Sequence, residues 1–192
     1  MRFVHINGIV VALLLGLGCW QLGQGVWIHA KALLAQQLLQ QAWAESLGGE
    51  QQVRPWPWAD TWPLARLRIK RLGVDQILLA GASGRSLAFG PGHVSGTAAP
   101  GAMGNSVISG HRDTHFRFLK QLQDGDRLEI QLPDGGLARY AVTGAHVHHQ
   151  DEVWLLEPTL MPQLTLVTCY PFDSPIPGGP LRYVVTAKAV EI

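Results

Sequence analysis

Short stretches rich in β-branched, aliphatic and aromatic residues follow one another from residue 64 onward, and glycine or proline turns separate them. Runs of about four to eight such residues with frequent turns are typical of an antiparallel sandwich or barrel. Hairpin signals occur at Leu72-Gly73 and at Asp134-Gly135-Gly136. The sequence therefore predicts a mainly β domain forming a closed or nearly closed barrel, with strands at residues 65–72, 76–80, 106–109, 127–132, 138–149, 164–169 and 182–190.

Two short helices are predicted within this region. One covers residues 116–122, with Asp113 and Thr114 as expected caps and Asp124-Gly125 as its end. The second would lie near residues 87–93, where the glycines and a proline favour a turn equally.

The N-terminal region contains a run of apolar residues and glycines from residue 8 to residue 20, which reaches residue 28 if two glutamines are tolerated. A helix of about 21 residues just crosses a bilayer core of about 30 Å. Arg2 precedes the run, and Trp20 and Trp27 stand where an aromatic belt would lie. We predict a transmembrane anchor at residues 1–29, with the rest of the chain outside the cytoplasm.

Two other interpretations of this region remain open. The run has the length of a signal-peptide core, so cleavage competes with anchoring. The glycines beside Cys19 also suggest a lipoprotein site, although Gly16 stands where such sites usually carry a larger aliphatic residue.

Residues 30–63 are predicted to connect the anchor to the barrel domain, residues 64–192. Apolar residues at helical spacing predict an amphipathic juxtamembrane helix, with the stripe Leu34, Leu38, Leu39, Ala42, Trp43 and Leu47. Alternatively, the stripe packs against the domain. Gly48-Gly49 ends this helix, and the Pro/Trp-rich segment 55–63 is expected to be a linker.

Composition and charge exclude several classes of protein. Hydrophobic residues make up 47% of the chain and charged residues 15%, which excludes a disordered chain. The formal net charge is +1, so no basic excess exists for binding nucleic acid. Two cysteines, Cys19 and Cys169, cannot form a disulfide framework.

Three residues at predicted strand ends carry candidate chemistry. Cys169 closes the strand at 164–169, and Pro171 stops the ladder two residues later. His111 follows the strand at 106–109, beside a glycine that permits close approach of a backbone or a ligand. Arg182 opens the last strand. A thiol beside an imidazole suits nucleophilic acyl transfer, and a guanidinium stabilises developing negative charge. A buried structural cysteine, a loop histidine and a surface arginine are the alternatives.

The same residues resemble the sortases, a family of membrane-anchored cysteine transpeptidases. The similarity spans residues 65–192 and is carried by TLVTC at 165–169, SGHRDTHF at 109–116, PLRY at 180–183, GPGH at 90–93 and PGAMGN at 100–105. Histidine, cysteine and arginine occur in the family's order. The Trp-rich segment and the short domain look most like the class GN sortases of Gram-negative bacteria.

The resemblance implies an eight-stranded barrel in which Cys169 attacks the Thr–Gly bond of an LPxTG-like signal on a secreted protein. It implies His111 as acid and base, Arg182 on the substrate carbonyl, and the Thr168 backbone in the oxyanion hole. An unidentified amine then accepts the acyl group. No cofactor is implied, and the domain would lie in the periplasm, tethered to the inner membrane.

Two other functions remain open. One is a zinc-dependent hydrolase, because His111 and His115 are four apart and His146, His148 and His149 cluster on one strand. Against it, alternation places His149 on the opposite face, and no Cys-x-x-Cys occurs. The other is a noncatalytic, membrane-tethered binding barrel in which Cys169 is dispensable.

Overall fold

The computed structural model describes the backbone of residues 2–176 and 178–190, and the side chains of residues 11, 13–176 and 178–190. The chain divides into two compact units, Met1–Gln37 and Leu38–Ile192. A single helix, α1 (Arg2–Leu47), contains the predicted anchor and the predicted juxtamembrane helix, and it ends before Gly48-Gly49 as expected.

The predicted membrane anchor stays a prediction. Within the described part of the chain, no helix combines the length and the apolar character that a bilayer span requires. The predicted anchor begins within residues 1–10, whose side chains lie outside the described residues.

The last turns of α1, residues 38–47, belong to the second unit. Their buried positions recur at helical spacing: Leu39, Ala42, Trp43 and Ser46. Leu39 and Trp43 pack against Ile77 and Leu79 of strand β2. Part of the predicted stripe thus packs against the barrel, which is the alternative that the sequence left open, whereas Leu47 is exposed.

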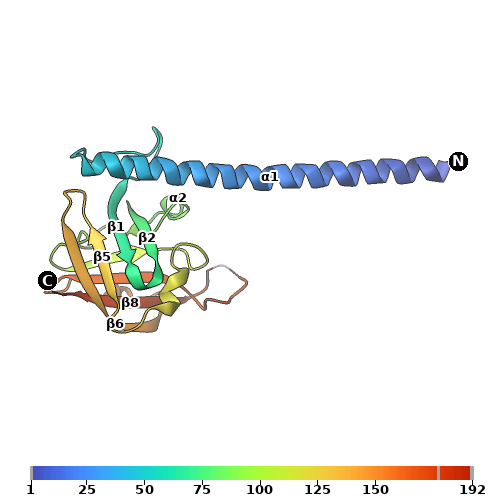
Figure 1. The fold of residues 1–192 in the computed structure, drawn as a ribbon. Coiled ribbons are helices and arrows are strands. Elements are labelled where there is room, and N and C mark those ends of the chain that lie inside the picture. Colours follow the sequence, from blue (N-terminus) through green and yellow to red (C-terminus); the bar gives the residue numbers. More distant parts are fainter. Residues whose placement is uncertain (1, 177, 191–192) are drawn as a thin grey trace. The chain divides into compact units, whose positions relative to one another are not determined.

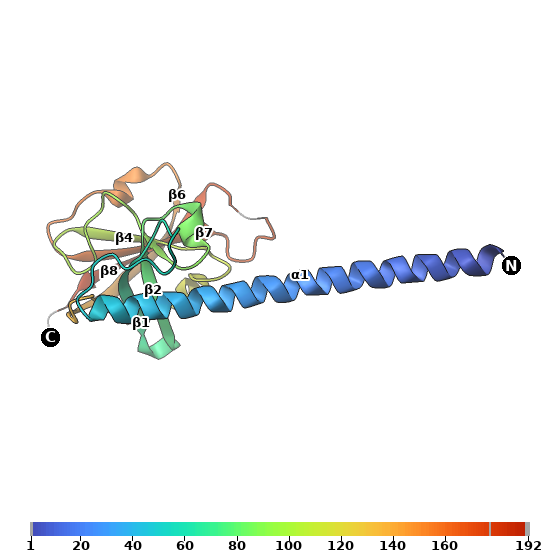
Figure 2. The ribbon, with the colours of Figure 1, turned by 90° about the horizontal axis from the view of Figure 1, so that it is seen from above.

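The second unit is a closed eight-stranded barrel, and Figures 1 and 2 show its ribbon in two views. Its strands are β1 (Pro63–Ile69), β2 (Val74–Ala80), β3 (Gly92–His93), β4 (Asn105–Ser109), β5 (Arg127–Gln131), β6 (Leu137–His149), β7 (Gln163–Tyr170) and β8 (Leu181–Ala189). Around the barrel the order is β1-β2-β3-β4-β7-β8-β6-β5. The predicted barrel is therefore confirmed, and strand β7 lies between β4 and β8.

Strand β1 shows the expected alternation of buried and partly exposed residues. The inward-facing residues of β7, Leu164 and Leu166, are fully buried and join the core with Leu67, Ile108 and Val185. Both predicted hairpin turns occur. Gly73 and Gly135 adopt positive φ values of 63° and 83°, which glycine accepts at no steric cost.

The helix predictions were partly wrong. Residues 92–93, expected in a helix or turn, form strand β3, and the helix α2 (Gly84–Leu87) lies before them. Residues 70–72, predicted as strand, form the 3₁₀ helix η1 (Lys70–Leu72). The predicted helix at 116–122 is a 3₁₀ helix, η2 (Arg117–Gln121), with no side-chain cap. Asp113 lies three residues before the N-cap residue, Phe116, and its carboxylate binds the neighbouring Arg112.

Candidate active site

Cys169 lies on the outer face of β7, one residue before the strand ends. Its inward neighbour Thr168 is 2% exposed, whereas the Cys169 thiol is free and partly exposed. Pro171 follows the last strand residue, Tyr170, as expected. The sulfur is therefore not sealed inside the barrel.

His111 lies beside this strand end because β4 runs parallel to β7. The register pairs Ser109 with Val167. Two hydrogen bonds extend the alignment: Gly110 N donates to Val167 O at 3.1 Å, and Thr168 Oγ1 donates to Gly110 O at 2.7 Å. His111 follows Gly110, two residues beyond the end of β4, and is exposed at the same barrel end.

Arg182 lies on the other side of the nucleophile strand. Its Cα pairs with that of Cys169 across the antiparallel β7–β8 ladder, so both side chains leave the same face. The guanidinium donates to Gly179 O at 2.7 Å, to Leu181 O at 2.9 Å and to Gln150 Oε1 at 3.1 Å. The backbone thus brings the three predicted residues to the ends of three adjacent strands.

Thr168 has the orientation that alternation predicted. Its side chain is buried and bonds to the Gly110 carbonyl, so it points away from the thiol. The predicted role of its backbone in an oxyanion hole stays a prediction.

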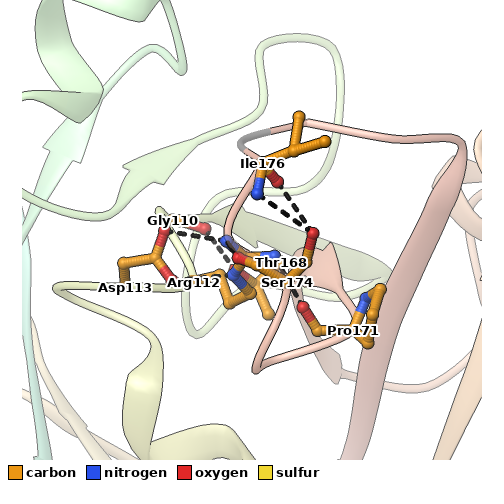
Figure 3. Close-up of polar contacts among 7 residues, drawn as sticks. All are labelled: Gly110, Arg112, Asp113, Thr168, Pro171, Ser174 and Ile176. Carbon is orange, nitrogen blue, oxygen red and sulfur yellow. Dashed lines mark hydrogen bonds and ion pairs between the residues drawn. The ribbon is translucent and has the colours of Figure 1, made fainter.

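Arg112 is a site residue that the sequence did not single out. It is 4% exposed, and its Nε and Nη2 donate to the Asp113 carboxylate at 2.7 and 3.0 Å. Its Nη1 donates to Pro171 O at 2.6 Å and its Nη2 to Ser174 O at 2.9 Å. Figure 3 shows the guanidinium between Asp113 and the loop that follows the nucleophile.

The charges around Arg112 reinforce one another. The hydrogen bond that Arg112 donates to Asp113 raises the pKa of Arg112, burial acts in the opposite direction, and charge interactions with Asp113, Cys169 and Asp173 raise this pKa further. The Arg112 guanidinium in turn holds the pKa of Asp113 below its ordinary value, and charge interactions with His111 add to this effect. Arg112 follows His111 directly, but no pattern in the sequence indicated that this arginine is buried.

His115 lies within charge range of His111. Burial is the main cause that lowers the pKa of His115, and the charge of His111 lowers it further. A hydrogen bond with the Ala88 backbone acts in the opposite direction. His115 is therefore held toward its neutral form beside the candidate site.

A pocket of about 440 Å³ opens on the outer face that also carries Cys169. Thr165 of β7 and Val184 of β8 line its floor, and Trp154, Leu155 and Pro158 line its wall. Val184 is the Cα partner of Val167, the residue between Thr165 and Cys169 on this face. The pocket therefore lies on the same face of β7 and β8 as the thiol, although neither Val167 nor Cys169 lines it.

Glu152 holds the wall of this pocket in place. Its carboxylate accepts hydrogen bonds from His148 Nδ1 at 2.9 Å, His149 N at 2.7 Å and Trp154 Nε1 at 3.3 Å. The bond from His148 is the main cause that lowers the pKa of Glu152. Glu152 thus ties the end of β6 to the 3₁₀ helix η3 (Val153–Leu156), which bears Trp154.

The histidines of β6 divide between two faces. His146 and His148 line the pocket, whereas His149 contacts Asp151 at 3.1 Å. Among the described residues, no group of three or more His, Cys, Asp or Glu side chains is placed to hold a metal ion. The alternation used against a zinc site is therefore seen in the structure.

Comparison with known proteins identifies relatives of the barrel. The sequence model of the Sortase domain matches residues 67–190. Sortase D of Bacillus subtilis (strain 168) is 32% identical over 127 residues, which cover 65% of this chain. The match covers 62% of Sortase D, which is less than two thirds of that protein.

Solved structures share the fold. A Sortase D5 transpeptidase of Clostridium perfringens is 30% identical with a TM-score of 0.60, and the match covers 68% of this chain and 80% of the other. Sortase A from Corynebacterium diphtheriae is 28% identical with a TM-score of 0.64, and the match covers 76% and 68%. These relatives are described as sortases A and D, so they do not support class GN.

Proposed function

Because this chain belongs to the sortase family, we propose that it is a cysteine transpeptidase acting on a sorting signal of another secreted protein. The observation that supports this most directly is the convergence of Cys169, His111 and Arg182 at the ends of three adjacent strands. A thiol, an imidazole and a guanidinium on one open face provide a nucleophile, a proton carrier and a donor to an oxyanion.

In the proposed reaction, the Cys169 thiol passes its proton to His111 while its sulfur attacks the carbonyl carbon of the threonine in an LPxTG-like signal. Arg182 and the Thr168 backbone donate to the oxygen that gains negative charge. His111 gives a proton to the departing glycine amine as the C–N bond breaks, which leaves a thioester on Cys169. An amine then attacks the thioester and gives a proton to His111, which returns it to the departing sulfur, so that a new amide bond forms and the Cys169 thiol is restored.

The pocket offers a place for the apolar part of the signal. An extended peptide rises about 3.3 Å per residue, so the proline and leucine of an LPxT segment lie roughly 7 and 10 Å before the threonine. On β7, Val167 and Thr165 lie about 7 and 13 Å from Cys169 by the same rise. Trp154, Leu155 and Pro158 line the pocket together with Thr165, and they match leucine and proline in polarity.

The test uses the full chain with a fluorogenic peptide library of LPxTG-like signals and an added amine such as triglycine. We expect turnover and, by mass spectrometry, an acyl adduct on the tryptic peptide that contains Cys169. Cys169→Ala abolishes both. Cys19→Ala, which removes the other free thiol, is the matched control and retains both. Undiminished turnover by Cys169→Ala would disprove the proposal, and signal binding without any adduct would favour the noncatalytic barrel.

We further propose that residues 1–29 tether the enzyme to the cytoplasmic membrane with the barrel on the extracytoplasmic side. The apolar run from residue 8, the preceding Arg2 and the extracytoplasmic destination of sorting signals support this location. Protease added to intact spheroplasts should degrade the barrel, and carbonate washing should leave the chain in the membrane fraction. Protection of the barrel from protease, or release by carbonate, would contradict the proposal.

A further inference from the structure

We propose that Arg112 is a positioning residue that fixes His111 and the β7–β8 loop around the nucleophile. The kinetic part of this inference rests on the proposed transpeptidation, whereas its structural part does not. The hydrogen bonds of Arg112 go to the Asp113 carboxylate and to the carbonyls of Pro171 and Ser174. Arg112 acts through the backbone groups that it binds.

The first support is the length of chain that Arg112 bridges. Its guanidinium binds the Pro171 and Ser174 carbonyls, which lie 59 and 62 residues away along the sequence. Both carbonyls belong to the loop that joins Cys169 on β7 to Arg182 on β8. One side chain therefore fixes the connection between the nucleophile and the candidate oxyanion donor.

The second support concerns His111. Its preceding residue, Gly110, accepts a hydrogen bond from Thr168 on the nucleophile strand. Its following residue, Arg112, binds the loop after that strand. The backbone on both sides of His111 is thus tied to the segment that carries Cys169, as Figure 3 shows for the flanking residues.

The third support is the chemistry of the guanidinium. A planar fork of five N–H donors binds a carboxylate and two carbonyls at once, which a lysine ammonium cannot reproduce in the same geometry. Asp113 provides the opposite charge that a 4% exposed cation requires. Ser174 Oγ continues the network by donating to Ile176 O at 3.0 Å. The buried charge is therefore paired and faces the loop.

The test measures amide hydrogen exchange over residues 171–176 together with kcat and KM. In Arg112→Met we expect exchange about 10- to 100-fold faster in this segment, because hydrogen bonds to a charged group are lost. We expect kcat/KM to fall about 100-fold through kcat, since small displacements of reacting groups slow catalysis strongly. The Asp113 side chain is largely exposed, so Asp113→Asn should disturb folding less than Arg112→Met. It should show smaller changes in the exchange rate and in kcat/KM.

Arg71→Met is the matched control. Arg71 also binds an aspartate, Asp126, and a backbone carbonyl, Gln121 O, but on η1. The Arg71→Met variant should leave both the amide exchange of residues 171–176 and kcat unchanged. Arg112→Lys keeps the charge without the fork, so its kcat should stay near that of Arg112→Met.

Two results would overturn the inference. One is unchanged exchange over residues 171–176 in both Arg112→Met and Asp113→Asn. The other is full activity in Arg112→Lys while the loop still exchanges fast, because charge alone would then suffice. If the wild type turns over no sorting signal, the transpeptidation proposal fails, and faster exchange in Arg112→Met but not Arg71→Met still supports the positioning role.

Discussion

Cys169 and Arg182 face each other as Cα partners across the β7–β8 ladder, and their side chains leave the same face of the barrel. The ladder holds the two positions at a fixed separation, whereas the arginine side chain binds acceptors in two loops. The β7–β8 ladder therefore fixes the position of the Arg182 backbone, and the acceptors in the two loops fix the direction in which its N–H groups point.

This pairing predicts that Arg182→Ala lowers kcat/KM about 100- to 1,000-fold, the range observed when a donor to a developing oxyanion is removed. The change should appear in the rate at which the thioester forms, measured in single-turnover experiments. Gln150→Ala removes one resting acceptor of the guanidinium, and it should change kcat/KM less than threefold. A wild-type acylation rate in Arg182→Ala would exclude the arginine from the first step.

Glu152 provides a second prediction, which concerns affinity. Glu152→Gln keeps the size of the side chain but removes the charge that binds His148 and Trp154. The pocket wall should loosen, so we expect KM for the signal peptide to rise about three- to tenfold with kcat unchanged. Glu129→Gln, in an ion pair with Lys70 on the barrel surface, serves as the control. A fall in kcat at constant KM would contradict this role.

Much of the barrel could be predicted from local patterns in the sequence. Alternation along 164–169 placed Thr168 inward and Cys169 outward, and the structure agrees. Proline and glycine positions predicted where β7 and the hairpins end, since their backbone restrictions act locally. Strand β3 was missed because two residues, Gly92 and His93, carry no periodic signal. The register with β2 and β4 alone defines it.

The missed features of the candidate site depend on contacts between distant segments. Arg112 looked like an ordinary polar neighbour of His111, and its burial follows from carbonyls about 60 residues away. Asp113 was expected to cap the following helix, but pairing with that arginine takes its carboxylate. Such side-chain choices depend on tertiary packing, which a pattern within one segment does not encode.

His115 provides a prediction about pH. Its pKa in the folded chain lies below the ordinary value of 6.5, so the unfolded chain binds a proton first as the pH falls. The free energy of unfolding should therefore decrease as the pH drops below about 6.5, and this slope should be absent in His115→Asn. Denaturant titrations between about pH 7 and pH 5 measure it, above the range in which the carboxylates titrate. Equal slopes in both proteins would contradict this assignment.

Gly110 gives the last prediction, because the structure shows what lies against it. A Cβ at this position would stand 2.8 Å from the ring of Phe116, which is fully buried in the core. The ring or the backbone would have to shift within the packed core, so Gly110→Ala should destabilise the fold by about 1–3 kcal/mol. The strain falls beside His111, and we therefore expect kcat to decrease even where the protein stays folded. Gly84→Ala is the control, since no atom lies within 4 Å of its Cβ position. Denaturant unfolding and kcat should be measured on both variants. Equal free energies of unfolding would contradict the prediction, because the Phe116 ring would then accommodate the added methyl group without loss of stability.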